Sequence, residues 1–243
     1  ALVSTVGFAQ LRTVTFQVDL GSTAANMNGV HVAGDFQDTA GATGNWKPDE
    51  TTLTQVGTST IYDVTVSIPD GRYEYKMLNG DDWPDEESIP SESQVGGGNG
   101  NRFVNIYKDT TLPAILFSGN APAGKNLMRI AADMAQAGTY GTVTAAGDWQ
   151  MAAGFPGDWD ATATQLFADP NRADVFERLV YVPADTFQLK MIEGGNWEYV
   201  PSACEVGGNR QVIVGGDVIE ENCYAMCGPC PTAPIPQYNM TLM

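Results

Sequence analysis

An eleven-residue segment occurs twice in this chain, and the repeat limits the possible folds more than any other feature of the sequence. YEYKMLNGDDW at residues 73–83 returns as FQLKMIEGGNW at residues 187–197, an offset of 114 residues. Each copy is an alternating run followed by a glycine-containing turn and a tryptophan. This pattern predicts a strand that delivers an aromatic side chain to a loop. A match of this length indicates a duplicated structural unit.

Matching segments lie on both sides of this repeat. The pairs are 34–37 (GDFQ) with 147–150 (GDWQ), 45–46 with 158–159, 62–69 with 176–183, and 95–102 with 206–210. The chain of 243 residues therefore predicts two modules of ordinary domain size. The expected division is 1–10 as a leader-like segment or extra strand, 11–117 as the first module, 118–124 as a semi-flexible linker, 125–230 as the second module, and 231–243 as an extended C-terminal tail.

Short alternating runs separated by Gly, Pro and Asn turns indicate an all-β chain. Strands are expected near residues 14–20, 30–34, 53–56, 61–68, 73–78, 103–107 and 112–117, with their counterparts in the second copy. Residues 127–137 would suit a helix by composition, but the repeat aligns them with the first strand, so a strand is predicted there. The expected fold is two tandem immunoglobulin-like antiparallel β-sandwich domains.

Charge and hydropathy exclude several classes of partner. The formal net charge of −17 argues against nucleic acid and anionic membrane surfaces, which bind clustered Lys and Arg. No apolar run is long enough to span a bilayer. The acidic residues within 81–92 do not follow a calcium-loop spacing and are expected to form a solvated loop. The single histidine, His31, is expected to face outward from its strand.

The start of the chain suggests export, and its end suggests a further strand. Residues 1–10 (ALVSTVGFAQ) resemble the end of a secretory signal, or form an additional strand. Residues 238–243 have the pattern of a strand. An extracellular or cell-surface location is therefore expected.

All four cysteines lie in the last forty residues of the chain: Cys204, Cys223, Cys227 and Cys230. A zinc site could be drawn from them, and CGPC spells a thioredoxin-type motif, but disulfides are favoured in an exported chain. The expected pairs are Cys204–Cys223 and Cys227–Cys230. No cofactor or metal is expected.

Four polar or aromatic residues recur in both copies on expected loops or strand edges. They are Trp46, Lys76, Trp83 and Asn101 in the first, and Trp159, Lys190, Trp197 and Asn209 in the second. Indole faces cover the apolar face of a pyranose, a Lys amine donates to hydroxyl groups, and an Asn carboxamide both donates and accepts. These residue types predict a carbohydrate-binding surface.

The order of these motifs resembles the starch- and glycogen-binding modules of the family 20/48 type, particularly the repeats of exported Bacteroidetes proteins. The resemblance covers residues 12–230. It implies an immunoglobulin-like sandwich that binds α-1,4-glucan through two Trp, a Lys and an Asn, which correspond to the eight residues above. The four cysteines resemble the closing cysteines of those bacterial repeats.

Two functions follow from these observations. The first is an exported, non-catalytic protein that holds an α-glucan-like polysaccharide. The alternative is a structural subunit of an extracellular fibre or adhesin that self-associates by strand exchange through its terminal segments. An enzyme is not expected, because a chain with one histidine offers no Ser/His/Asp or Cys/His arrangement.

Overall fold

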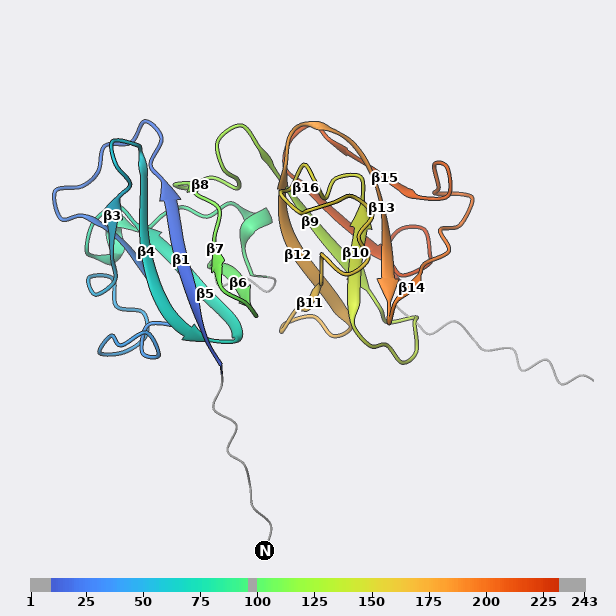
Figure 1. Cartoon of the computed structure of the whole chain (residues 1–243), viewed down its shortest axis with the longest axis horizontal. Coiled ribbons are helices and arrows are strands. Elements are labelled where there is room, and N and C mark those ends of the chain that lie inside the picture. The colour runs from blue at the N-terminus through green and yellow to red at the C-terminus, as the bar shows by residue number, and fades with distance from the viewer. Residues whose placement is uncertain (1–9, 96–99, 232–243) are drawn as a thin grey trace, which may run out of the picture. The chain divides into compact units, whose positions relative to one another are not determined.

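The computed structural model describes residues 10–95 and 100–231, and the chain divides into two compact units that meet between Gly124 and Lys125 (Figure 1). The all-β class is confirmed. Within the described ranges the regular structure consists of sixteen strands and two short 3₁₀ turns. The segment expected as a leader or extra strand lies outside the described residues except for Gln10, as does the strand expected at residues 238–243.

The first unit contains eight strands and both 3₁₀ turns. They are β1 (Leu11–Asp19), β2 (Val30–Gly34), β3 (Thr52–Gln55), β4 (Ile61–Pro69), β5 (Gly71–Leu78), η1 (Trp83–Asp85), η2 (Ser91–Ser93), β6 (Arg102–Ile106), β7 (Thr110–Thr111) and β8 (Ile115–Leu116). The expected strands are present, but the one predicted over residues 112–117 is replaced by the short strands β7 and β8.

The second unit also contains eight strands. They are β9 (Asn126–Asp133), β10 (Val143–Gly147), β11 (Phe167–Ala168), β12 (Val175–Val182), β13 (Asp185–Glu193), β14 (Asn196–Trp197), β15 (Arg210–Val214) and β16 (Val218–Cys223). The segment whose composition also suited a helix is strand β9, as the repeat predicts.

In the first unit, β3 joins two layers of strands. Its first half pairs with β2 and its second half with β4, so the strand order runs β6-β5-β2-β3-β4-β1-β7. In the second unit the β10-β13-β14 sheet, in which β15 also pairs with β13, is separate from the β11-β12-β9-β16 sheet. A single bridge between Thr144 and Gln165 marks the same corner. Alternate residues of each strand fill one core per unit, with Phe16 and Phe36 central to the first and Trp149 to the second.

One edge of each unit differs from the expected antiparallel pattern. β7 and β8 run parallel to β1, and β16 runs parallel to β9. The closing strand enters beside the first strand after leaving the other layer of strands, so the two run in the same direction. Part of the expected linker also packs on the first unit: Ala121 is buried, and the Gly119 carbonyl accepts a hydrogen bond from Arg102.

Two residues expected to be exposed are buried. His31 does lie on the outward side of β2, but only 4% of it is accessible, and its Nδ1 lies 2.7 Å from the Gly80 carbonyl oxygen. The loop after β5 therefore covers it. The acidic segment after β5 is largely exposed, but Glu87 is buried because its carboxylate forms an ion pair with Arg102.

The expected cysteine pairing is wrong, although both disulfides form. The bonds are Cys204–Cys227 and Cys223–Cys230. After β16 the chain turns back, and the Cys223 N–H donates to the Gly228 carbonyl at 2.9 Å. This turn brings Cys230 beside Cys223 and leaves Cys227 for Cys204. With all four sulfurs in disulfides, neither a zinc-thiolate site nor a Cys227–Cys230 redox pair is formed.

Candidate functional site

The candidate lysines lie on the outward faces of two corresponding strands, β5 in the first unit and β13 in the second. Tyr75 and Met77 of β5 point into the core, so Lys76 between them faces away from it. In β13 the core residues are Leu189 and Met191, and Lys190 faces outward in the same way. Each unit therefore presents its amine on the outer surface of one sheet.

Gly34 and Gly147, the last residues of β2 and β10, allow the backbone to approach the neighbouring lysine strand at close range. A Cβ atom at Gly34 would lie 2.5 Å from the Glu74 carbonyl oxygen, and at Gly147 it would lie 2.1 Å from that of Gln188. Only glycine fits such an approach. The next residue extends the contact, because Asp35 accepts the Glu74 N–H at 2.9 Å and Asp148 accepts the Gln188 N–H at 2.7 Å.

A fully buried glutamine fixes the loop that carries the first indole of each unit. Gln37 Oε1 accepts the Lys47 N–H at 2.8 Å, and its Nε2 donates to the Lys47 carbonyl at 2.9 Å. Gln150 makes the same two bonds to Asp160, both at 2.9 Å. The glutamine thus holds both backbone groups of the residue that follows the tryptophan.

The tryptophan itself adopts an uncommon backbone conformation in both units. Trp46 has φ 58° and Trp159 has φ 57°, a left-handed region that large side chains rarely occupy. The backbone N–H of each tryptophan donates to the carbonyl of the closely packed glycine, Gly34 or Gly147, at 3.0 Å. Such strain persists where the surrounding hydrogen bonds determine it, and it is concentrated at functional sites.

The second indole is delivered differently in the two units. The bridge between Leu78 and Glu86 corresponds to the pair Ile192 with Trp197, so Trp197 stands in register with Glu86 rather than with Trp83. The tryptophan follows the lysine at the same sequence spacing in both units, but it does not occupy the same position in the strand pairing. Trp83 belongs to the 3₁₀ turn η1 of a longer loop, whereas Trp197 lies on the short strand β14.

Despite this difference, the two indole pairs have nearly the same geometry. The ring centroids of Trp46 and Trp83 are 6.3 Å apart with planes inclined at 41°. Those of Trp159 and Trp197 are 6.2 Å apart and inclined at 38°. Trp83 is 37% exposed and Trp197 is 43% exposed. Each pair forms a tilted, solvent-facing aromatic surface.

The two lysines differ in their electrostatic surroundings. The Lys76 amine lies 2.7 Å from a Glu86 carboxylate oxygen. In the second unit the indole of Trp197 replaces that carboxylate in the backbone register. Among residues 10–95 and 100–231, no group accepts a hydrogen bond from the Lys190 amine. The donors of the Lys190 amine are therefore not engaged by the described residues, whereas the Lys76 amine is engaged by Glu86.

Each asparagine is hydrogen-bonded to the residue that lies two positions before the lysine on the lysine strand. Asn101 Nδ2 donates to the Glu74 carboxylate at 2.9 Å, and Asn101 is only 9% exposed. Asn209 Nδ2 donates to the Gln188 side-chain oxygen at 2.7 Å. The partner is charged in the first unit and neutral in the second.

A buried ion pair joins two of the strands that support each site. The Glu87 carboxylate accepts the Met77 N–H at 2.9 Å and forms a two-pronged contact with Arg102, at 2.9 and 2.6 Å. Glu198 does the same with the Met191 N–H at 2.8 Å and with Arg210 at 2.9 and 2.7 Å. The pair links the end of the lysine strand to the strand that follows the asparagine.

Sequence reasoning did not assign roles to these supporting residues. The glutamine, the acidic partner and the arginine hold the site without facing solvent. The repeated GDFQ/GDWQ and NR segments contained the signal for two of them, whereas Glu87 and Glu198 stand at an offset of 111 residues that the 114-residue alignment does not reveal.

Neither a metal centre nor a membrane-spanning helix is found in the described parts of the chain. No group of three or more His, Cys, Asp or Glu side chains there is arranged to hold a metal ion. No helix in those parts is long and apolar enough to cross a bilayer.

Comparison with known proteins gives one family match and several distant structural likenesses. The family model described as the pullulanase X25 domain matches residues 29–114. Curated protein sequences give no significant match. The matched range contains Trp46, Lys76, Trp83 and Asn101, the complete candidate site of the first unit.

Many solved structures resemble the chain, among them the following three at low identity. A family CBM26 protein, CBMbc from Eubacterium rectale Amy13K solved with maltoheptaose, is 15% identical, with 92% of this chain and 99% of that chain covered and a TM-score of 0.33. A family 15 glucoamylase from Hypocrea jecorina is 20% identical, with 60% and 23% covered and a TM-score of 0.32. A streptococcal virulence factor described for α-glucan binding is 9% identical, with 87% and 92% covered and a TM-score of 0.28.

Proposed function

We propose that this chain is a non-catalytic carbohydrate-binding protein whose two tilted indole pairs each hold a segment of an α-glucan-like polysaccharide. The observation that carries the proposal is the recurrence of one indole geometry, at 6.3 and 6.2 Å, on two differently built loops. Core packing does not account for this agreement, because Trp83 and Trp197 are exposed. A ligand that contacts both rings of a pair does require it.

The inclination of the rings favours an α-linked chain. Planes tilted by 41° and 38° suit two successive pyranose rings of a glucan that turns from one residue to the next. A flat ribbon of β-1,4-linked sugars would match coplanar rings instead. The match of residues 29–114 to a pullulanase X25 domain supports the same class of ligand.

The expected affinity is modest. Covering roughly 100 Å² of each indole at ~25 cal/mol/Å² gives about 5 kcal/mol for a pair before the costs of ordering. After those costs, each site is expected to bind in about the millimolar to micromolar range. Two sites in one chain would raise the apparent affinity for a polymer long enough to reach both.

An extracellular location belongs to the same proposal. Both disulfides, Cys204–Cys227 and Cys223–Cys230, favour an oxidising compartment. A polysaccharide ligand is also most accessible there.

Affinity electrophoresis in gels that contain pullulan or amylopectin tests the proposal. Wild-type protein should be retarded, Trp83→Ala and Trp197→Ala should each reduce the retardation, and the double variant should migrate as in a gel without polysaccharide. Leu11→Ala is the matched control, because Leu11 is 60% exposed and lies on β1, which carries none of the eight candidate residues. Unretarded wild-type protein, or a double variant that is retarded like wild type, would overturn the proposal.

A further inference from the structure

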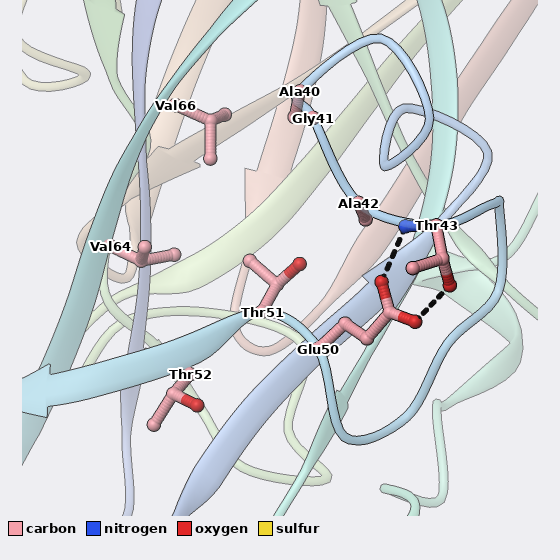
Figure 2. A pocket seen from close by; sticks show the side chains of 9 residues that line it. All are labelled: Ala40, Gly41, Ala42, Thr43, Glu50, Thr51, Thr52, Val64 and Val66. Atoms are coloured by element: carbon pink, nitrogen blue, oxygen red, sulfur yellow. Dashed lines mark hydrogen bonds between the residues drawn. The ribbon is translucent and has the colours of Figure 1, made fainter.

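The first unit contains a pocket of about 440 Å³ whose lining does not include the indole pair (Figure 2). Its volume lies within the range of ordinary small-molecule sites, ~300–1,000 Å³. The lining residues are Ala40, Gly41, Ala42, Thr43, Glu50, Thr51, Thr52, Val64 and Val66. The two valines come from β4, and the small residues come from the loop that follows Gln37. One side of the pocket is therefore apolar.

The corresponding positions of the second unit can be identified from matching hydrogen bonds. The Ala42 N–H donates to the Gln37 carbonyl at 2.9 Å, and the Phe155 N–H donates to the Gln150 carbonyl at the same distance. Phe155 thus occupies the position of Ala42.

Strand register gives the second equivalence. Val64 pairs with Phe16 of β1, and Arg178 pairs with Ile130 of β9, so Arg178 occupies the position of Val64.

The second unit fills this space with its own side chains. The Phe155 ring packs edge-on against Trp149, with centroids 5.9 Å apart and planes at 89°. The Arg178 guanidinium lies 5.5 Å from the centre of the Phe155 ring. The same backbone therefore accommodates an aromatic ring and a cation at the place where the first unit has two small apolar side chains.

The first unit also adds an anion at this place. The Glu50 carboxylate accepts hydrogen bonds from the Thr43 N–H, at 2.6 Å, and from the Thr43 hydroxyl (Figure 2). These bonds lower the pKa of Glu50, so the group is ionised at neutral pH. Two of its lone-pair positions remain for a donor. The residue before Thr164 in the second unit, where Glu50 would stand, is Ala163.

We propose that this pocket binds a small ligand in which an aromatic ring carries a cationic group. The ring lies among Ala42, Val64 and Val66, where the second unit has Phe155, and the cation lies at the Glu50 carboxylate. The ligand supplies the two chemical features, ring and positive charge, that Phe155 and Arg178 supply in the second unit. None of the lining residues belongs to the eight candidate carbohydrate-binding residues.

Saturation-transfer NMR with phenethylamine tests this site. Irradiation of the valine methyl groups should transfer saturation to the ring protons of phenethylamine. Phenylacetate reverses the charge, so it should bind at least tenfold more weakly. Glu50→Gln should remove the preference for phenethylamine over phenylacetate.

The variant Ala42→Phe/Val64→Arg supplies the matched control, because it fills the pocket as the second unit does. It should lose phenethylamine binding at least tenfold while retaining the fold and binding of maltoheptaose. Ala42→Leu is a second, smaller filling that should also weaken binding. Absence of saturation transfer to wild type, equal binding to a folded filled variant, or an unchanged charge preference in Glu50→Gln would overturn the proposal.

Discussion

The two units form the same aromatic surface from different local structures. In the first, a seven-residue loop separates Leu78 from Glu86, and Trp83 lies within it on a 3₁₀ turn. In the second, only four residues separate Ile192 from Trp197, which lies on a short strand. The loop differs in length and the indole differs in register, yet the ring pair keeps its spacing and tilt.

What differs between the sites is their charge. In the first unit, Lys76 lies against Glu86 and Asn101 against Glu74. In the second, the Lys190 amine has no acceptor among the described residues, and Asn209 contacts the neutral Gln188. Ring geometry therefore accounts for what the sites share. Whether neighbouring side chains already engage the lysine amine and the asparagine carboxamide should determine how strongly each unit binds a neutral sugar.

The largest effect should come from breaking the buried ion pair behind either site. Arg102→Met or Arg210→Met leaves a buried carboxylate without its partner, which should cost about 3–5 kcal/mol in the stability of that unit. Scanning calorimetry should show one transition lowered in each variant. Arg12→Met is the control, because its partner Asp70 is exposed and the loss should be below about 1 kcal/mol. Equal losses of stability in Arg12→Met and Arg102→Met would show that the buried ion pair contributes no more than the exposed one.

Reduction of the disulfides is expected to have the next largest effect and to lower the stability of the second unit alone. Loops of 23 and 7 residues correspond to about 3 and about 2 kcal/mol of chain entropy when each bond is considered alone. The second unit should therefore lose stability in dithiothreitol. The first unit has no cysteine and serves as the internal control. A downward shift of the first transition, or an unchanged second transition, would show that the disulfides do not act locally.

A smaller effect is expected from the two lysines. Lys190→Met removes an amine that is available to the sugar and should weaken binding in the second unit by about 1 kcal/mol, or roughly fivefold. Lys76→Met should change binding in the first unit less, because Glu86 already engages that amine. Glu86→Gln should strengthen it. Indole N–H signals followed by NMR during a maltoheptaose titration report the units separately, and equal losses in both lysine variants would remove the proposed difference.

The smallest effect concerns Asp35. Burial, together with the nearby Glu74 and Asp38 carboxylates, raises the pKa of Asp35 despite hydrogen bonds that oppose the shift. Because the folded pKa is above the unfolded one, its favourable contribution is present at low pH and is lost as pH rises through the folded value. Asp35→Asn should thus raise the melting temperature of the first unit slightly at pH 7 and leave it unchanged near pH 3. A larger stabilisation at pH 3 than at pH 7 would contradict the sign.

Much of the fold could be predicted from the sequence because alternation and turn residues are local signals. Val14, Phe16 and Val18 alternate, and they do enter the core. The parallel closing strands and the disulfide pairing could not be predicted. Both depend on where the chain returns in space, as when the turn after Cys223 brings Cys230 to it.

The candidate site was identified by residue type, but its supports were not. Repetition indicates that a glutamine recurs at Gln37 and Gln150 without indicating that it holds the loop after each tryptophan. Similarly, the equal spacing from Lys76 to Trp83 and from Lys190 to Trp197 hides a change of register. A tertiary contact, the approach of one indole to the other, sets the position of the second ring.

Titration calorimetry with maltoheptaose measures how many indole pairs in the chain bind sugar. We expect two binding events per wild-type chain and one in either Trp83→Ala or Trp197→Ala. Each substitution should weaken its own site by about 2.5 kcal/mol, roughly 60-fold, and the double variant should show no measurable heat of binding. Binding that persists unchanged in the double variant, or no binding by wild-type protein at millimolar sugar, would contradict the proposal that the paired indoles hold an α-glucan.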